Sequence, residues 1–192
     1  MSLLEQQKIL ARLYTDENLR ERFFSEPEKT GAENNLTATE IEGIKSILPA
    51  EIRFFADSLF YKRLREVEKL LPLTRQVLSS DFETHFRRFA SEFLPDSIKK
   101  HLDDAIKFCA FLRLQNLEPL CLVDLIRFEQ AKLKFIGYQK QFVGRRFQFD
   151  VREILEEVSR KGRKTQSFSQ IGKRRTVAVW FRLGNKSRHF VW

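Results

Sequence analysis

The spacing of apolar residues predicts helices over most of the first 137 residues. Residues 3–13, 16–25 and 37–48 carry Leu, Ile or Phe at steps of three and four, so three short helices are expected there. Thr37 and Glu40 have the spacing of a capping box at the start of the third helix. The stretch TGAENN before them is predicted to be a loop.

A longer helix is expected at 50–71, because Pro49 can precede it and no helix breaker interrupts its apolar stripe. Further helices are predicted at about 72–78, 80–93, 98–112 and from Pro119 to Gly137. Nineteen Phe against three Tyr and two Trp indicate a Phe-lined helical core, because Phe packs but offers no polar group to a ligand.

The apolar period changes in the last fifty residues. Residues 146–151 alternate as in a short strand, although Asp150 and Glu153 are equally the cap of a helix at 151–159. Residues 160–175 are basic and polar without an apolar period, which is typical of a loop with local disorder.

Two alternating runs flank Gly184-Asn185 and predict a β-hairpin with a tight two-residue turn. In that register Val177 opposes Trp192 and Val179 opposes Phe190, and we expect these pairs to build one apolar face. Trp180, Arg182 and His189 fall on the other face.

The fold class expected is mainly α (α+β), with a helical body and a small C-terminal antiparallel β-hairpin unit. We predict three parts: an N-terminal three-helix subdomain at 1–48, a helical core at 49–137, and a basic C-terminal unit at 145–192 that contains the hairpin.

Charge is distributed unevenly along the chain. Residues 1–60 have a net charge of −4 and residues 61–192 have a net charge of +13, which together give the net +9 of the chain. The basic end favours an acidic partner, which could be a nucleic acid, an acidic peptide, or the acidic N-terminal part of this chain.

No signal peptide and no apolar run of about 20 residues is present, so a cytoplasmic protein without membrane association is expected. Cys109 and Cys121 lie among Leu, Phe and Ile, and core packing is the favoured interpretation of both.

The sequence contains no recognisable catalytic constellation. Its three His residues lie far apart without His or Cys at metal-ligand spacing, and no GxGxxG, phosphate-binding loop or GxSxG motif occurs. We therefore expect no enzyme activity, no cofactor and no metal.

Two stretches, residues 59–90 and 118–135, resemble a group of bacterial helical proteins. These are described as DNA-binding and as partners of multinuclear non-haem iron oxidases that modify ribosomally made peptides. The residues that carry the resemblance are Leu71, Pro72, Leu73, Val77, Leu78, Asp81, Phe82, Phe86 and Phe89, followed by Asp124, Leu125, Arg127, Phe128, Glu129 and Ala131. Residues 10–44 also resemble a small helical module that is often joined to those proteins. Gln130 stands where the group usually has Trp, and its Pro-rich segment is reduced to LPDS.

The resemblance implies a non-catalytic accessory protein that recruits a peptide substrate to a modifying metalloenzyme. The alternative is a nucleic-acid-binding regulatory protein, and a third possibility is an enzyme of unrecognised type. The oligomeric state is left open.

Candidate contact residues follow from the basic C-terminal region. For nucleic acid they are Arg160, Lys161, Arg163, Lys164, Lys173, Arg174 and Arg175, because phosphate binding needs clustered cations. For a peptide, an acidic or extended segment is expected to add along strand 176–183 or 186–192, contacted by Arg182, Arg188 and His189. The alternative is that the hairpin only covers the helical core.

Overall fold

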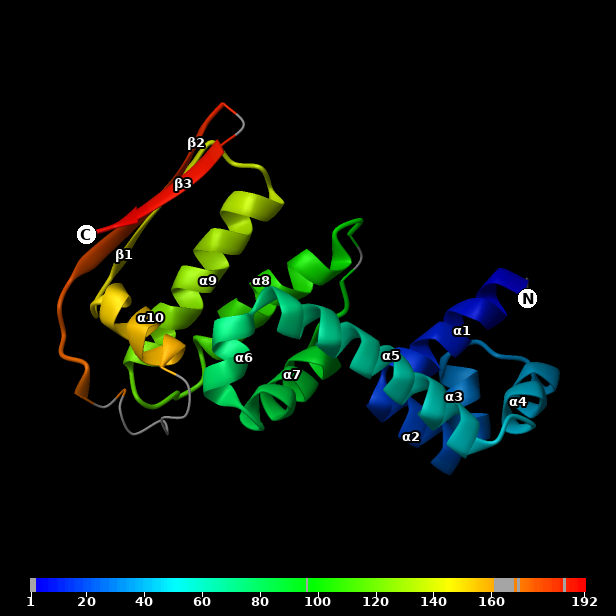
Figure 1. Ribbon diagram of the computed structural model, residues 1–192. Coiled ribbons are helices and arrows are strands. Elements are labelled where there is room, and N and C mark those ends of the chain that lie inside the picture. The colour runs from blue at the N-terminus through cyan, green and yellow to red at the C-terminus, as the bar shows by residue number, and fades with distance from the viewer. Residues whose placement is uncertain (1–2, 96, 161–167, 169, 185) are drawn as a thin grey trace. The chain divides into compact units, whose positions relative to one another are not determined.

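The computed structural model describes all residues except 1–2, 96, 161–167, 169 and 185 (Figure 1). The described chain contains ten α-helices and one three-stranded antiparallel sheet near its C-terminus, which confirms the expected mainly α class. It divides into two compact units. The first comprises residues up to Arg65 with Ala90–Leu94, and the second comprises Glu66–Phe89 with Pro95–Trp192. The predicted three-part division at 1–48, 49–137 and 145–192 stays a prediction.

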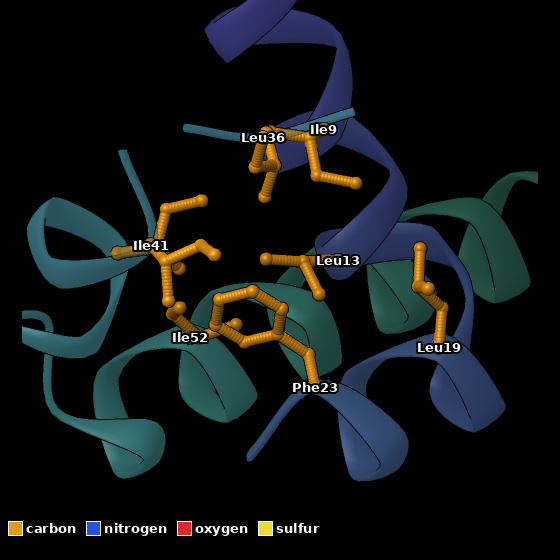
Figure 2. Close-up of a cluster of buried hydrophobic side chains, with 8 residues drawn as sticks. Ile9, Leu13, Leu19, Phe23, Leu36, Ile41 and Ile52 are labelled. Atoms are coloured by element: carbon orange, nitrogen blue, oxygen red, sulfur yellow. The ribbon is translucent and has the colours of Figure 1, made fainter. Parts of the chain in front are cut away.

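The first unit is built from short helices around one apolar core. They are α1 (Leu3–Thr15), α2 (Glu17–Ser25), α3 (Pro27–Glu33), α4 (Ala38–Lys45) and the first part of α5 (Pro49–Leu70). Figure 2 shows side chains from these helices, Leu13, Phe23, Ile41 and Ile52 among them, pointing toward one another. The predicted capping box is confirmed, because Glu40 N donates to Thr37 Oγ1 and Thr37 N donates to Glu40 Oε2.

Helix α3 corrects the expectation of a loop before Thr37. Its first residue is Pro27, whose fixed φ suits the first helical position. Thr30 and Gly31 are buried, and a Cβ at Gly31 would lie 2.5 Å from Ile41 Cδ1. The close packing of α3 on α4 therefore outweighs the low helix propensity of Gly and Thr.

The second unit is built from further helices, two of which pack against each other through a cluster of Phe rings. The helices of this unit are the end of α5, α6 (Pro72–Leu78), most of α7 (Asp81–Glu92), α8 (Lys100–Leu112), α9 (Cys121–Gly137) and α10 (Val151–Ser159). Phe82 and Phe86 of α7 each meet Phe108 of α8 edge to face, with centroids 5.2 Å apart. The Phe-lined core is thus confirmed. Helix α8 begins at Lys100 and not at the predicted residue 98, and Ile98, which was expected on its apolar face, is fully exposed.

Strands β1 (Phe142–Phe147), β2 (Thr176–Leu183) and β3 (Lys186–Val191) form the sheet in the order β1-β2-β3. One face lies on α9 (Figure 1), where Ala178 and Trp180 are buried against Phe128 and Phe135. Val179 pairs with Phe190 as the sequence predicted, and Gly184 between β2 and β3 has a φ of 58°, as a tight turn requires. The hairpin is confirmed.

The predicted division of side chains between the two faces of the hairpin is confirmed, and the structure adds which face is buried. Trp180 lies on the buried face, while Val179 and Phe190 lie on the face turned away from α9. The first strand also begins earlier than the predicted 146–151. The alternative prediction of a helix at 151–159 is confirmed as α10. Asp150 caps this helix by accepting a hydrogen bond from Arg152 N.

Candidate functional site

The predicted basic contact residues do not form one cluster. Arg160 ends α10 and pairs with Glu157 at 3.1 Å, and Arg174 pairs with Asp150 at 3.4 Å. Lys173 and Arg175 are exposed in the approach to β2. Lys161, Arg163 and Lys164, with half of the stretch 160–175 that was predicted to be locally disordered, lie outside the described residues.

The three residues predicted for peptide contact lie on two faces of the sheet. Arg182 is half-buried on the α9 face, where its Nε donates to Lys140 O at 3.3 Å and its guanidinium lies 5.2 Å from the Phe135 ring centre. His189 is on the same face and stacks on Trp180 with centroids 6.4 Å apart. Arg188 is opposite Phe181 and lies on the other face.

The face of the sheet turned away from α9, called the outer face below, is apolar and exposed. Alternation places Val177, Val179 and Phe181 of β2 on it, because Ala178 and Trp180 point toward α9. Their cross-strand partners on the outer face are Phe142, Phe190 and Trp192, which are 63%, 56% and 61% exposed. Contiguous exposed apolar surface of this kind is typical of a binding face.

Cations border this outer face. Arg146 of β1 and Lys186 and Arg188 of β3 occupy outer-face positions, since each lies an even number of residues from Phe142 or Phe190. The rings of Phe181 and Phe190 stack at 5.8 Å in the middle of the face. The surface therefore combines apolar side chains with positive charge at its margin.

The sheet has two unpaired edges, on β1 and on β3. Val177 and Trp192 exchange both backbone hydrogen bonds, at 2.8 and 3.1 Å. In an antiparallel pair this fixes the alternation, so Ser187, His189 and Val191 direct their N–H and C=O groups to the open side of β3. Within the described part of the chain nothing pairs with them. The predicted edge at 176–183 is wrong, because β2 is the central strand.

A cationic cavity of about 220 Å³ lies on the α9 side of the sheet. Its lining is Arg113 from the end of α8, Arg127, Gln130 and Lys134 from α9, and Arg145 from β1. A neighbouring cavity of about 600 Å³ lies beside Phe147 and shares Arg127, with Arg146, Gln148, Arg175, Thr176 and Val177 also lining it.

Sequence reasoning missed the 220 Å³ cavity. Arg127, Gln130 and Lys134 follow at steps of three and four, which places them on one face of a helix. That spacing was the signal in the sequence from which the α9 side of the cavity could have been predicted. Arg113 and Arg145 come from other elements, and no local pattern associates them with α9.

Two buried carboxylates on α9 hold backbone segments from elsewhere in the unit. Asp124 Oδ2 accepts hydrogen bonds from Gln148 N at 2.6 Å and Phe149 N at 3.0 Å. Glu129 accepts from Leu73 N at 3.0 Å and Thr74 N at 2.8 Å, at the start of α6. Asp124 and Glu129 are two of the polar residues that carry the family resemblance, and in this chain both have structural partners.

Both cysteine thiols of the core are held in the protonated form. Burial raises the pKa of the Cys109 thiol, and it raises the pKa of Cys121 to about 11, so both thiols stay protonated at neutral pH. Both side chains are buried, which confirms core packing. Among the described residues no three His, Cys, Asp or Glu side chains gather as a metal ion would need.

No protein-family model matches the sequence, and no curated protein and no solved structure is significantly similar to it. Among the helices of the described chain, none has the length and apolar character needed to cross a bilayer.

Proposed function

We propose that this chain is a non-catalytic binding protein that takes up an extended acidic segment of a peptide or protein along the open edge of β3. The observation that carries the proposal is the combination of an unpaired strand edge with an exposed apolar face and a cationic margin. Strand addition at such an edge supplies backbone hydrogen bonds, and the adjoining side chains supply specificity.

The register of the sheet supports a particular kind of segment. A strand added beside β3 would bond to the outward groups of Ser187, His189 and Val191. Its alternate side chains would lie on the outer face beside Arg188 and Phe190. The preferred segment therefore has an acidic residue and an apolar residue two positions apart.

The family resemblance noted in the sequence supports a peptide as the partner, because that group accompanies peptide-modifying iron oxidases. Recruitment of the peptide to such a metalloenzyme stays a prediction. An adjacent iron-oxidase gene and a short Cys-rich peptide gene would support this partner class.

A backbone substitution tests the proposed edge. His189→Pro removes an outward N–H while leaving the hydrogen bonds between β2 and β3 intact, and Pro is tolerated on edge strands. His189→Ala is the matched control, because it removes the same side chain and keeps the N–H. Fluorescence polarisation with labelled peptides should show binding by the Ala variant and loss of binding by the Pro variant. If the Pro and Ala variants are both folded and bind the peptide with equal affinity, the β3 edge is not the binding site.

A charge reversal tests the acidic preference. Arg188→Glu should weaken binding of an acidic peptide by roughly tenfold, since attraction at the margin becomes repulsion. Arg53→Glu, at an exposed position of the first unit, is the control for net charge. If both reversals weaken binding equally, the effect belongs to overall charge and not to the outer face.

Nucleic-acid binding is the second candidate, favoured by exposed Phe190 and Trp192 beside Arg188. Exposed rings next to cations can stack single-stranded bases, and such binding falls steeply with salt. Binding of single-stranded DNA that is lost in Phe190→Ala and unchanged in His189→Pro would support this candidate over the peptide.

A further inference from the structure

The 220 Å³ cavity collects cationic side chains from three elements of the second unit. Arg127, Gln130 and Lys134 share one face of α9, while Arg113 is the C-cap of α8. Arg145 lies between Val143 and Phe147 on the α9 side of β1, opposite to the outer face. Four cations and one amide therefore converge on a single space.

Little negative charge compensates these cations. Asp124 pairs with Arg127 at 2.9 Å. Arg113, Lys134 and Arg145 are left without a described ion pair. Burial lowers the pKa of Lys134, and the charges of Arg145, Lys140 and Arg113 lower it further. The lining of the cavity therefore carries a net positive charge.

The polar lining and the convergence of charge restrict the ligand. Arg and Lys side chains bind phosphate by charge-assisted hydrogen bonds, and Arg can do so with two parallel N–H groups. Gln130 Nε2 donates one hydrogen to Ile106 O at 2.8 Å and carries a second. The cations surround one space and do not follow a line, which suits a compact anion better than a polymer backbone.

We propose that this cavity binds a compact, multiply charged phosphate of the pyrophosphate class. Arg113, Arg127, Lys134 and Arg145 would neutralise its charge, and binding would fasten α8, α9 and β1 together. The site is independent of the peptide edge, because Arg145 and the outer face lie on opposite sides of the sheet.

Calorimetric titration of the full chain with inorganic pyrophosphate at low salt tests the proposal. The wild type should bind pyrophosphate more tightly than inorganic phosphate, and sulfate should bind no better than phosphate. Arg145→Gln should weaken pyrophosphate binding by about tenfold or more, as expected for loss of a charge-assisted hydrogen bond. Arg146→Gln is the matched control, since it removes the same charge from the next residue, on the opposite face of the sheet. The pyrophosphate affinity of this variant should stay within about twofold of the wild-type value.

A stability measurement supplies a second readout. Lys134→Met removes a half-buried cation from among like charges, so it should raise the melting temperature without ligand and reduce the rise that pyrophosphate produces. Absence of pyrophosphate binding by the folded wild type would overturn the proposal. Equal weakening by Arg145→Gln and Arg146→Gln would overturn it as well, because the anion would then respond to general surface charge or span both cavities. Binding of single-stranded DNA, but not of pyrophosphate, through Arg145 would assign the cavity to a nucleic-acid backbone instead.

Discussion

Replacement of Asp124 by Asn should destabilise the second unit strongly, although it changes only one atom of the side chain. Asp124 is 3% exposed, and its Oδ2 accepts the N–H groups of both Gln148 and Phe149. Its Oδ1 accepts from Arg127 Nη1 at 2.9 Å. Asn offers a single acceptor oxygen, so it can keep the two backbone contacts or the Arg127 contact, but it cannot keep both.

The magnitude follows from these three hydrogen bonds. With the amide oxygen toward Gln148 and Phe149, two hydrogen bonds to a charged acceptor become bonds to a neutral one, a loss of about 1 kcal/mol each. The amide NH₂ then faces the Arg127 guanidinium, where two donors meet and a partly buried ion pair worth about 1 kcal/mol is lost. The total is about 3 kcal/mol, a large share of the roughly 5–15 kcal/mol that stabilises a domain.

Urea unfolding followed by Trp fluorescence measures this loss in the second unit. Trp180 lies in β2 and Trp192 directly follows β3, and Trp180 is buried against Phe128, so its emission should shift when the unit unfolds. Glu156→Gln is the control, because Glu156 is exposed on α10 and its substitution should change the free energy of unfolding by less than about 0.5 kcal/mol. A loss below about 1 kcal/mol for Asp124→Asn would refute the clamping role assigned to this carboxylate.

Two further predictions concern Glu129 and Gly184. Burial raises the pKa of Glu129 above its ordinary value of 4.5, so its contribution to stability is fully present below pH 4.5 and is lost as pH rises through the folded-state pKa. The stability of the wild type should therefore fall with rising pH relative to Glu129→Gln in paired urea titrations, and parallel pH profiles would contradict this. Gly184→Ala should cost about 1–2 kcal/mol in the same assay, because the φ of 58° strains any Cβ although open space surrounds it. Gly184→Asn should lower the free energy of unfolding by less than Gly184→Ala. Equal losses of stability in the two variants would show that backbone strain is not the cause.

The sequence predicted most of the elements, with α3 and the position of β1 as exceptions, but it did not predict which face of the hairpin is buried. Alternation in β2 separates Val177 and Val179 from Ala178 and Trp180, and it does not say which set faces the core. The structure buries the set with the small Ala178, because α9 approaches closely there and Trp180 fills the space beside it. The more uniformly apolar set remains outside, which reverses the usual expectation for a half-buried strand.

The cavity and the two buried carboxylates show a second limit of prediction from the sequence. Arg113, Arg127 and Arg145 are neighbours only because α8, α9 and β1 pack together, and pairwise spacing along the chain carries no trace of that. Asp124 and Glu129 were visible as polar positions within an apolar helix. Their partners are backbone groups 24 to 56 residues away, and any residue type could supply those groups.

The order of the strands has a consequence for how the chain folds. β2 and β3 are joined by a tight turn, so their pairing closes a very short loop, whereas pairing of β1 with β2 must close the segment 148–175. Loop-closure entropy makes the local pair the easier one to form early. Until β1 docks, the central strand of the native sheet would itself be an edge strand. A nascent or refolding chain would then expose two edges on one hairpin, and recruitment of β1 would protect one of them from pairing with other chains.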